Sequence, residues 1–530
     1  MGEPGKGGRS VLGTLVALVL KTVWGIIVFT TPLLGVWGAS SLAAYKNGPI
    51  WLAILAGLAL FPLLPVGWEL GARWWRKRRL ARKRQDAKTF VLDGDEPKGF
   101  LTTADRVILR TLVVNLVFIG GLLTTHPEQA FEALSTRGDW MLEGRDDPTA
   151  DGLRHRIFWA ADRLEWLYVA VRDNPFREFG EKLEGSDEDP APAADADEGL
   201  PTPGPRPTAV PPKQGDDGTA KGGEDDGGAE PQSAKSAARW PMPAKLHPVV
   251  ASLPAEAEES IDSVARYIAA HESDPFLRVK ALHDYAADRV AYDAEALVSG
   301  NIPPQDAETT FRKRKSVCAG YATLLAALGK AAGAHIVFVP GDARTQGQGL
   351  GGGGHAWNAA KIEGQWYLLD ATWNSGSVAG TTFTKGYRTD YLFTPPKIFA
   401  LDHLPDKPRW QLLNKPLSRG EFLRQPMMSP GFYAQGFELL RPRRSQVSVS
   451  GFVDLEIANP KGMYLLASYG AKEGGSGSGE AQRCKVERTE PAKVHCELPS
   501  EGRYAVKLFA NAEEYGTFGY VGQLEVNNQP

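Results

Sequence analysis

Residues 316–332 (SVCAGYATLLAALGKAA) and residues 355–374 (HAWNAAKIEGQWYLLDATWN) decide the fold of the central part of this 530-residue chain. The first stretch places apolar residues at helical spacing behind Cys318, which indicates a helix that begins near the cysteine. The second alternates apolar and polar residues around Glu363–Gly364, which is typical of a β-hairpin with a two-residue turn. We therefore expect a helix that starts at a cysteine, followed by two antiparallel strands.

The register of this hairpin brings a histidine and a carboxylate together. If Ile362 pairs with Gln365, then His355 lies opposite Thr372. His355 and Asp370 then share one face of the sheet as diagonal neighbours, roughly 7–8 Å apart at the backbone. A loop one residue longer would place them on opposite faces. With the two-residue loop, the Asp370 carboxylate is within reach of the imidazole.

Cys318 has the setting of a reactive thiol. A cysteine at a helix N-terminus lies near unpaired N–H groups and the positive end of the helix dipole, and both favour the thiolate. The basic residues 313–315 add positive charge just before it. In a nucleophilic mechanism Cys318 attacks, His355 moves the proton, and Asp370 orients the imidazole. The alternative is that Cys318 is a small buried apolar residue, the commoner fate of a lone cysteine.

Several blocks of the sequence resemble the transglutaminase-like superfamily, in particular the kyphoscoliosis peptidase and cytokinesis-protein subgroup. The blocks are 316–322 (SVCAGYA), 355–358 (HAWN), 366–373 (WYLLDATW), 291–293 (AYD), 301–305 (NIPPQ), 391–396 (YLFTPP) and 403–406 (HLPD). The resemblance covers about residues 250–530 and leaves 1–240 undescribed. It implies a papain-like α+β fold in which the helix that carries the cysteine packs against a sheet that carries the histidine and the aspartate.

Three aromatic residues near these blocks are candidates for the wall of a substrate groove: Tyr321, Trp357 and Trp373. The competing interpretation is that they belong to the core, which is more common for aromatic residues on a hairpin. Both interpretations stay open from the sequence.

A cysteine acyl transfer also needs donors for an oxyanion. The backbone N–H of Cys318 is the first candidate and Gln305 the second, while Asn358 is a candidate for orienting groups in the site.

Cofactor and metal sites are not predicted. The glycine-rich run 347–354 (GQGLGGGG) lacks the Lys-Ser/Thr ending of a phosphate-binding loop, so we exclude nucleotide binding. It is equally consistent with a mobile flap over the site and with a surface loop. No stretch resembles a calcium-binding loop, so we expect no calcium requirement.

The formal net charge of -3 averages two unlike parts of the chain. Residues 1–125 hold 16 Lys and Arg against 7 Asp and Glu, and the rest hold 44 against 56. The N-terminal part contains apolar runs at 22–45, 48–68 and 111–127, which we interpret as three transmembrane helices. The basic cluster Arg73–Arg84 then places its loop and the N-terminus in the cytoplasm, in contact with membrane lipid rather than nucleic acid.

Residues after about 127 are therefore expected outside the cytoplasm. Residues 128–180 form a juxtamembrane helical segment, with one amphipathic helix over Leu153–Val171. Residues 181–240 carry 14 acidic and 6 basic residues with many prolines and glycines, which predicts a disordered linker that gives the following domain reach.

Residues 411–530 read as short alternating segments between turns, which predicts a small β-sandwich. Cys484 and Cys496 flank a turn at Glu490–Pro491 and are expected to pair in an oxidising compartment. That pairing leaves Cys318 as the free thiol. The alternative is two unpaired buried thiols.

The sequence thus predicts a membrane region (1–127), a juxtamembrane segment, a linker, a catalytic α+β domain (241–410) and a sandwich. The function we expect is a membrane-anchored cysteine enzyme acting on amide or peptide bonds of a protein or peptide substrate. Hydrolysis is slightly favoured over transfer to an amine, by analogy with the subgroup. The alternative is a scaffold that binds envelope or partner proteins with the same fold. The oligomeric state does not follow from the sequence.

Overall fold

The computed structural model describes residues 11–46, 48–86, 102–145, 147–171, 174–179, 240–345, 350–472 and 481–529. The predicted linker, 181–240, lies outside the described residues except for Trp240, and so does part of the glycine-rich run, 347–349.

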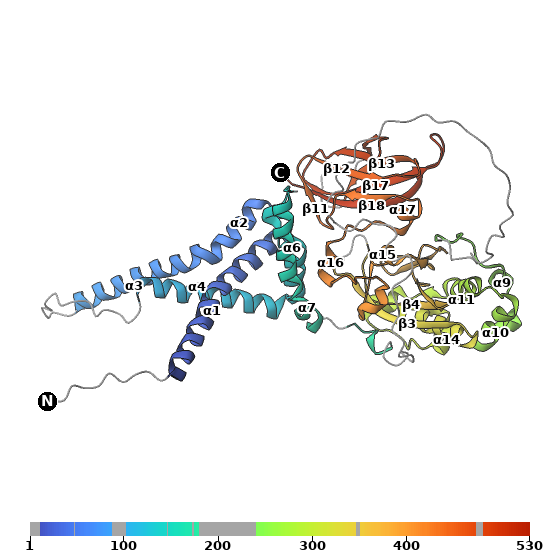
Figure 1. Ribbon diagram of the computed structural model, residues 1–530, viewed down its shortest axis with the longest axis horizontal. Coiled ribbons are helices and arrows are strands. Elements are labelled where there is room, and N and C mark those ends of the chain that lie inside the picture. The colour runs from blue at the N-terminus through green and yellow to red at the C-terminus, as the bar shows by residue number, and fades with distance from the viewer. Residues whose placement is uncertain are drawn as a thin grey trace, which may run out of the picture.

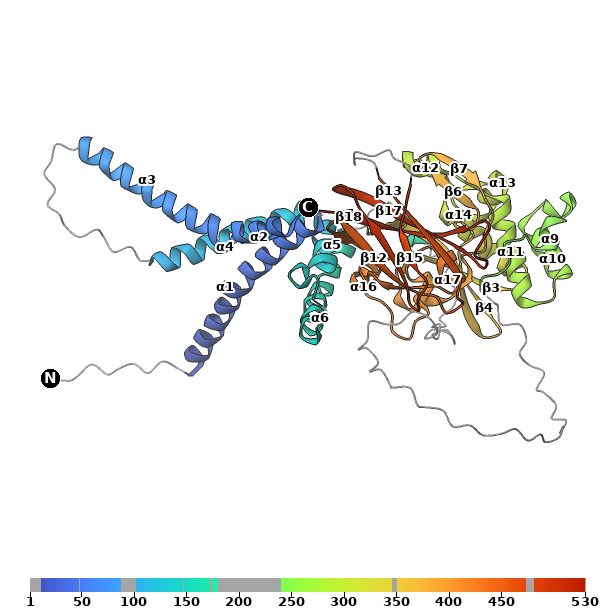
Figure 2. The same ribbon diagram turned by 90° about the horizontal axis from the view of Figure 1, so that it is seen from above.

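Apolar helices form the N-terminal part, extended to one side of the molecule (Figures 1 and 2). They are α1 (Val11–Tyr45), α2 (Ile50–Leu58), η1 (Ala59–Leu63), α3 (Leu64–Asp86) and α4 (Thr103–Thr125). Three stretches, Leu18–Tyr45, Ile50–Arg82 and Thr103–Thr125, are long and apolar enough to cross a membrane. The predicted multidomain fold, which begins with an α-helical transmembrane region, is confirmed.

A buried ion pair joins the third helix to the second. The guanidinium of Arg110 pairs with Glu69 of α3. Glu69 is buried, and its carboxylate also forms salt bridges with Arg73 and Arg106. A carboxylate inside the bundle satisfies the arginine better than the edge of a bilayer does, because both charges stay paired.

Short helices follow directly after the apolar bundle. They are α5 (Pro127–Arg137), η2 (Trp140–Leu142), α6 (Pro148–Asp162) and α7 (Glu165–Val171). The single helix predicted over Leu153–Val171 is therefore wrong, since a turn separates α6 from α7 after Asp162. Asp147 begins α6 by accepting hydrogen bonds from the N–H groups of Thr149 and Ala150.

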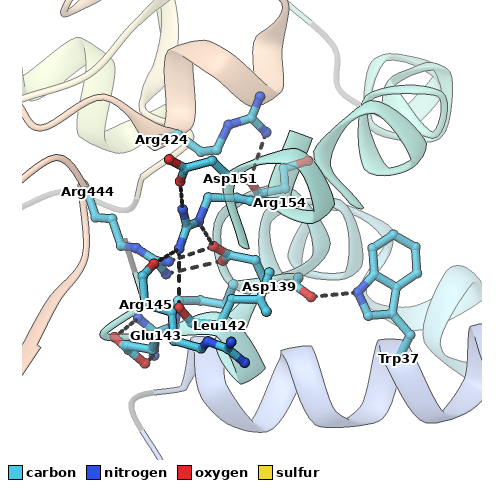
Figure 3. A network of polar contacts seen from close by, with 12 residues as sticks. Trp37, Asp139, Leu142, Glu143, Arg145, Asp151, Arg154, Arg424 and Arg444 are labelled. Carbon is cyan, nitrogen blue, oxygen red and sulfur yellow. Dashed lines mark hydrogen bonds and ion pairs between the residues drawn. The ribbon is translucent and has the colours of Figure 1, made fainter. Parts of the chain in front are cut away.

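The juxtamembrane helices are docked on the C-terminal half of the chain. Asp139 is completely buried and accepts from Arg154 Nε at 2.8 Å and from Arg444 Nη2 at 2.5 Å (Figure 3). Arg424 donates to the carbonyl of Ser135 at 2.9 Å. The expectation that the linker lets the folded part range away from the membrane is wrong, because these buried contacts hold it there.

The central α/β part contains a five-stranded sheet in the order β8-β5-β4-β3-β9. Its strands are β3 (His335–Ala343), β4 (Gly353–Ile362), β5 (Gln365–Leu369), β8 (Leu392–Thr394) and β9 (His403–Pro405). Its helices are α9 (Pro248–Ala251), η3 (Ala255–Glu258), α10 (Ile261–His271), α11 (Pro275–Arg289), α12 (Ala294–Ser299), α13 (Ala307–Lys313), α14 (Cys318–Ala331), α15 (Pro396–Phe399) and η4 (Pro408–Gln411). Two short two-stranded pairs, β1 (Ala291–Tyr292) with β2 (Lys315–Ser316) and β6 (Gly376–Ala379) with β7 (Thr382–Lys385), complete it.

Helix α14 packs against β3 and β4 and shares an apolar core with α10 and α11. The start of α14 fits so closely that a side chain at Gly320 would overlap Ser316 Oγ and Thr310 Oγ1, because a Cβ there would lie 1.8 and 2.4 Å from them. Glycine at this position therefore lets the helix begin against the preceding segment.

The predicted hairpin forms with the predicted turn. Ile362 pairs with Gln365, and Glu363 and Gly364 both have positive φ, as a type I′ turn requires. The ladder ends at Asn358 paired with Leu369, so the extension that would place His355 opposite Thr372 is wrong. The chain turns away after Leu369 because the N–H of Asp370 donates to the carbonyl of Tyr391.

The C-terminal part is a β-sandwich, seen beside the α/β part in Figure 1. One sheet has the order β10-β12-β16-β15 and the other β11-β18-β17-β13-β14. The strands are β10 (Glu438–Arg441), β11 (Val447–Val449), β12 (Phe452–Ala458), β13 (Tyr464–Ala471), β14 (Gln482–Arg483), β15 (Lys485–Glu487), β16 (Ala492–Glu497), β17 (Gly502–Asn511) and β18 (Gly519–Asn528). Before it, α16 (Arg419–Arg424) packs on α5 and α6, and α17 (Pro430–Ala434) packs on β18.

Candidate active site

Cys318 is the first residue of α14, directly after Val317 at the N-cap. Its side chain is buried, 1% exposed, in an apolar cluster with Ala322 of the same helix, Phe338 of β3 and Ala356 of β4. The first N–H groups of a helix have no acceptor within it, so the thiol lies among backbone donors. Cys318 therefore lies at the start of a helix, as the sequence predicts.

His355 on β4 connects the thiol to a carboxylate. Its Nε2–H donates to Asp370 Oδ2 at 2.8 Å, and the ring lies close enough to Cys318 for the thiol to raise the pKa of His355. The second oxygen of Asp370 accepts the N–H groups of Thr372 at 2.7 Å and Trp373 at 3.2 Å. The carboxylate is thus fixed on both oxygens, and the imidazole is fixed by the carboxylate.

The charges of this pair reinforce one another. Burial alone would lower the pKa of His355, but the charge of Asp370 and the contact with Cys318 raise the pKa to about 9. Burial alone would raise the pKa of Asp370, but His355 and His403 hold that pKa far below its ordinary value. The pair is therefore an imidazolium and a carboxylate at neutral pH.

His403 on β9 is a member of the site that no pattern in the sequence identified. Its Nε2 lies 3.3 Å from Asp370 Oδ2 and its Nδ1 lies 2.6 Å from Asp402 Oδ1. Because both neighbours are carboxylates, each favours a proton on the ring nitrogen that faces it. Burial alone would lower the pKa of His403, but Asp402 and Asp370 raise it. The only sequence signal was its place in the block 403–406, which carried no role by itself.

The ligand atoms of His355, Asp370 and His403 lie within 4.8 Å of one another. These are residue types that bind transition metals. However, the same atoms are hydrogen-bonded to each other, so their convergence is explained without an ion. An ion bound there would also take His355 Nε2 away from its carboxylate.

Gln305 holds the start of α14, and the structure does not aim its amide N–H at the thiol. Its Oε1 accepts from Ser316 Oγ at 2.8 Å and from the N–H groups of Val317 and Gly320 at 3.2 and 3.1 Å. Its Nε2 donates to the carbonyl of Pro303. The side chain therefore caps the helix through its oxygen. Its amide nitrogen has a second hydrogen besides the one given to Pro303, so its part as an oxyanion donor stays a prediction.

Asn358 orients the same helix from the sheet. Its Nδ2 donates to the carbonyl of Ala322 on α14 at 2.9 Å and to that of Val337 on β3 at 3.1 Å. A sequence pattern cannot show such a contact, since it joins residues 36 positions apart.

Two of the three aromatic candidates lie in the core. Tyr321 is fully buried, and its hydroxyl donates to the carbonyl of Val290. Trp357 is 1% exposed and packs against Phe399 and His403. Both therefore belong to the core, the alternative that the sequence left open, and their part in a substrate groove stays a prediction. Trp373 is half-buried and covers His355 and His403, with ring centroids 5.3 and 4.5 Å away, so it remains next to the site.

The other two cysteines lie in the sandwich. Cys484 and Cys496 form a disulfide across the β15–β16 hairpin, whose register places Lys485 opposite His495. Cys318 is the free cysteine of the chain.

Comparison with known proteins supports the same assignment. The family model of the transglutaminase-like superfamily matches residues 262–371, which include Cys318, His355 and Asp370. Kyphoscoliosis peptidase of Mus musculus is 32% identical over 251 residues, and that of Homo sapiens 31% over 252 residues. Each match covers 45% of this chain and 37% of the relative. Hillarin of Drosophila melanogaster is 24% identical over 231 residues, covering 37% of this chain and 28% of that protein.

The chain thus spans less than two-fifths of the length of these curated relatives. The match is confined to part of the chain, and it coincides with the α/β part that carries the cysteine, histidine and aspartate. Residues 262–371 therefore form a transglutaminase-like domain, similar to that of the kyphoscoliosis peptidases.

Proposed function

We propose that this chain is a membrane-anchored cysteine enzyme that acts on amide or peptide bonds through an acyl-Cys318 intermediate. The observation that carries the proposal is the connected path from the thiol through His355 to a doubly fixed Asp370. A structural cysteine needs no such path, whereas a nucleophile needs each part of it.

The chemistry follows from the positions of the groups. The Cys318 sulfur attacks the carbonyl carbon, a C–S bond forms, and the negative charge moves to the carbonyl oxygen. The His355 imidazolium gives its proton to the amine as the C–N bond breaks. The N–H of Cys318 is the donor proposed for the developing oxyanion, because the N–H groups of Val317 and Gly320 already donate to Gln305.

The second half of the reaction decides the type of enzyme. Water attacks the thioester in a protease or amidase, and His355 takes its proton while the C–S bond breaks. A primary amine attacks in a cross-linking transferase. We favour hydrolysis, because the relatives over this region carry the name peptidase.

The enzyme is held at a membrane by its three apolar helices, with the active site on the extracytoplasmic side. The basic run Arg73–Arg84 follows the second helix and is expected to stay in the cytoplasm. The third helix then carries the transglutaminase-like domain outward, into a compartment where the Cys484–Cys496 disulfide can form.

The test compares membranes that contain the wild-type chain, Cys318→Ala or His355→Ala. New protein N-termini in the wild type that disappear in both variants identify a hydrolase. Incorporation of a biotinylated primary amine into proteins identifies a transferase. If neither product depends on Cys318, the chain is a scaffold that uses the fold to bind protein partners, and the enzyme proposal fails.

A further inference from the structure

A short juxtamembrane segment, Asn174–Phe179, packs on the apolar cluster that contains Cys318. It follows α7 and belongs to the membrane-proximal part of the chain, yet its side chains pack on the transglutaminase-like domain. All three catalytic candidates beneath it are buried, with Cys318 at 1%, His355 at 6% and Asp370 at 0% exposure.

Phe176 is the residue of this segment that belongs to the apolar cluster of Cys318. It is 2% exposed. The other buried members of the cluster come from the start of α14 and from the adjoining segment and strands: Val317, Ala319, Ala322, Phe338 and Ala356. Phe179 adds a second aromatic contact, with its ring centroid 6.4 Å from that of Phe338. Small side chains beside the ring of Phe338 leave a space whose shape suits a flat aromatic ring.

Polar contacts hold the segment on both sides of this pocket. Asn174 Nδ2 donates to the carbonyl of Gly341 at 3.0 Å, and its Oδ1 accepts the N–H of Phe176 at 3.0 Å. Arg177 Nε donates to Asp406 Oδ2 at 3.1 Å. Gly354, the neighbour of His355, faces Asn174 so closely that a Cβ there would lie 3.0 Å from Oδ1.

Two backbone carbonyls of the segment accept hydrogen bonds from within it. The carbonyl of Asn174 accepts the N–H of Arg177 at 3.1 Å, and that of Phe176 accepts the N–H of Phe179 at 3.2 Å. These two carbonyls are engaged in the segment's own turns. The segment therefore places an aromatic ring in the buried cluster that contains the thiol.

We propose that the pocket filled by Phe176 is the subsite for an aromatic side chain of the polypeptide substrate, and that Asn174–Phe179 occupies it in cis until a substrate displaces it. Arg177, the residue after Phe176, pairs with Asp406 of the transglutaminase-like domain, so the substrate that fits carries an aromatic residue followed by a basic one. This inference rests on the proposed function, since it names what that site accepts.

The test uses the full chain in detergent and measures how fast iodoacetamide alkylates Cys318, which requires access and no turnover. Phe176→Ala is expected to raise the rate at least tenfold. The matched control, Phe452→Ala, removes an exposed phenylalanine of the sandwich and is expected to leave the rate unchanged. An unchanged rate in a folded Phe176→Ala variant would overturn the cis occupancy.

A second set of variants covers the case in which Phe176→Ala does not fold. Arg177→Glu changes a side chain that is 44% exposed and turns its pairing with Asp406 into repulsion. We expect faster alkylation in Arg177→Glu and a return to the slow rate in Arg177→Glu with Asp406→Arg. Equal rates in the single and double variants would contradict the role of the pair.

The substrate class is tested by protection in the opened variant. A blocked peptide Ala-Ala-Phe-Arg is expected to slow alkylation at a concentration at least tenfold lower than Ala-Ala-Ala-Arg does, and equal protection overturns the aromatic subsite. If the variants open the site and the peptides discriminate but no cleavage or transfer product appears, the subsite stands and the proposed enzyme fails. If the wild type forms product as fast as Phe176→Ala, the enzyme stands and the cis occupancy fails.

Discussion

His355 Nε2 lies 2.8 Å from Asp370 Oδ2, although Asp370 has already left the strand that pairs with β4. The ladder ends one residue earlier, and the turn after Leu369 directs the carboxylate at the ring. The same carboxylate oxygen also accepts a hydrogen bond from His403, so two imidazoles share one carboxylate.

Asp370→Asn is expected to lower product formation roughly 10³- to 10⁴-fold, because an amide can neither hold the imidazolium by charge nor enforce its tautomer. The rate is measured on whichever product depends on Cys318. The control is Asp454→Asn, an exposed carboxylate on β12 that pairs with His495. A loss smaller than tenfold in Asp370→Asn would show that the carboxylate does not act through His355.

His403→Asn is expected to lower the rate about tenfold, the equivalent of one hydrogen bond to a charged group. His403 positions Asp370 and does not touch the thiol, so its effect should appear in the pH profile as well. Without the cation, the Asp370 pKa rises, and the acid limb of the profile moves to higher pH. A rate loss with an unmoved acid limb would indicate general disruption of the fold.

The free energy of unfolding should decrease as the pH rises from 6.5 to 9, because His355 loses its proton in the folded chain. The pKa of His355 is about 9 in the folded chain and near 6.5 in the unfolded chain. The protonated imidazole therefore stabilises the fold fully below pH 6.5, and this stabilisation is lost as the pH rises through 9. The amount is on the order of 3 kcal/mol. Thermal unfolding of the full chain in detergent, compared with His355→Gln, measures it. His335→Gln, an exposed histidine at the start of β3, is the control and should keep the wild-type pH dependence.

Loss of the disulfide should destabilise the sandwich by about 3 kcal/mol, since the bond closes a short loop with a sequence separation of 12. The measurement is the unfolding of Cys484→Ala with Cys496→Ala against the wild type. Thiol titration of the denatured, unreduced chain should give one free group per chain. Three free groups would contradict the bond.

Asp139→Asn should loosen the docking of the juxtamembrane helices, because it removes the charge that balances Arg154 and Arg444 at a fully buried position. We expect the free energy of unfolding to fall by about 3 kcal/mol and proteolysis between α5 and α6 to become faster. The control is Glu487→Gln, which removes an exposed pairing with Lys485 and should not change the cleavage pattern. Unchanged protection in Asp139→Asn would mean that apolar packing alone holds this interface.

The sequence by itself determined the elements that local patterns encode. Apolar runs of sufficient length gave the three candidate membrane helices, because a membrane demands length and composition before anything else. Alternation around Glu363–Gly364 gave the hairpin and its register, since turn chemistry and side-chain period are local. The start of α14 at Cys318 and the pairing of Cys484 with Cys496 follow from the same kind of local information.

Only the tertiary structure decided what surrounds these elements. His403 joins Asp370 from 33 residues away, and Gln305 caps α14 from outside the helix. Phe176 covers Cys318 from the other side of the long acidic segment. None of these contacts has a period or a spacing in the sequence, because each depends on how distant surfaces pack. Local patterns therefore located the nucleophile and its base. Packing determined which charges surround them, which side chains fix the helix and which segment lies over the site.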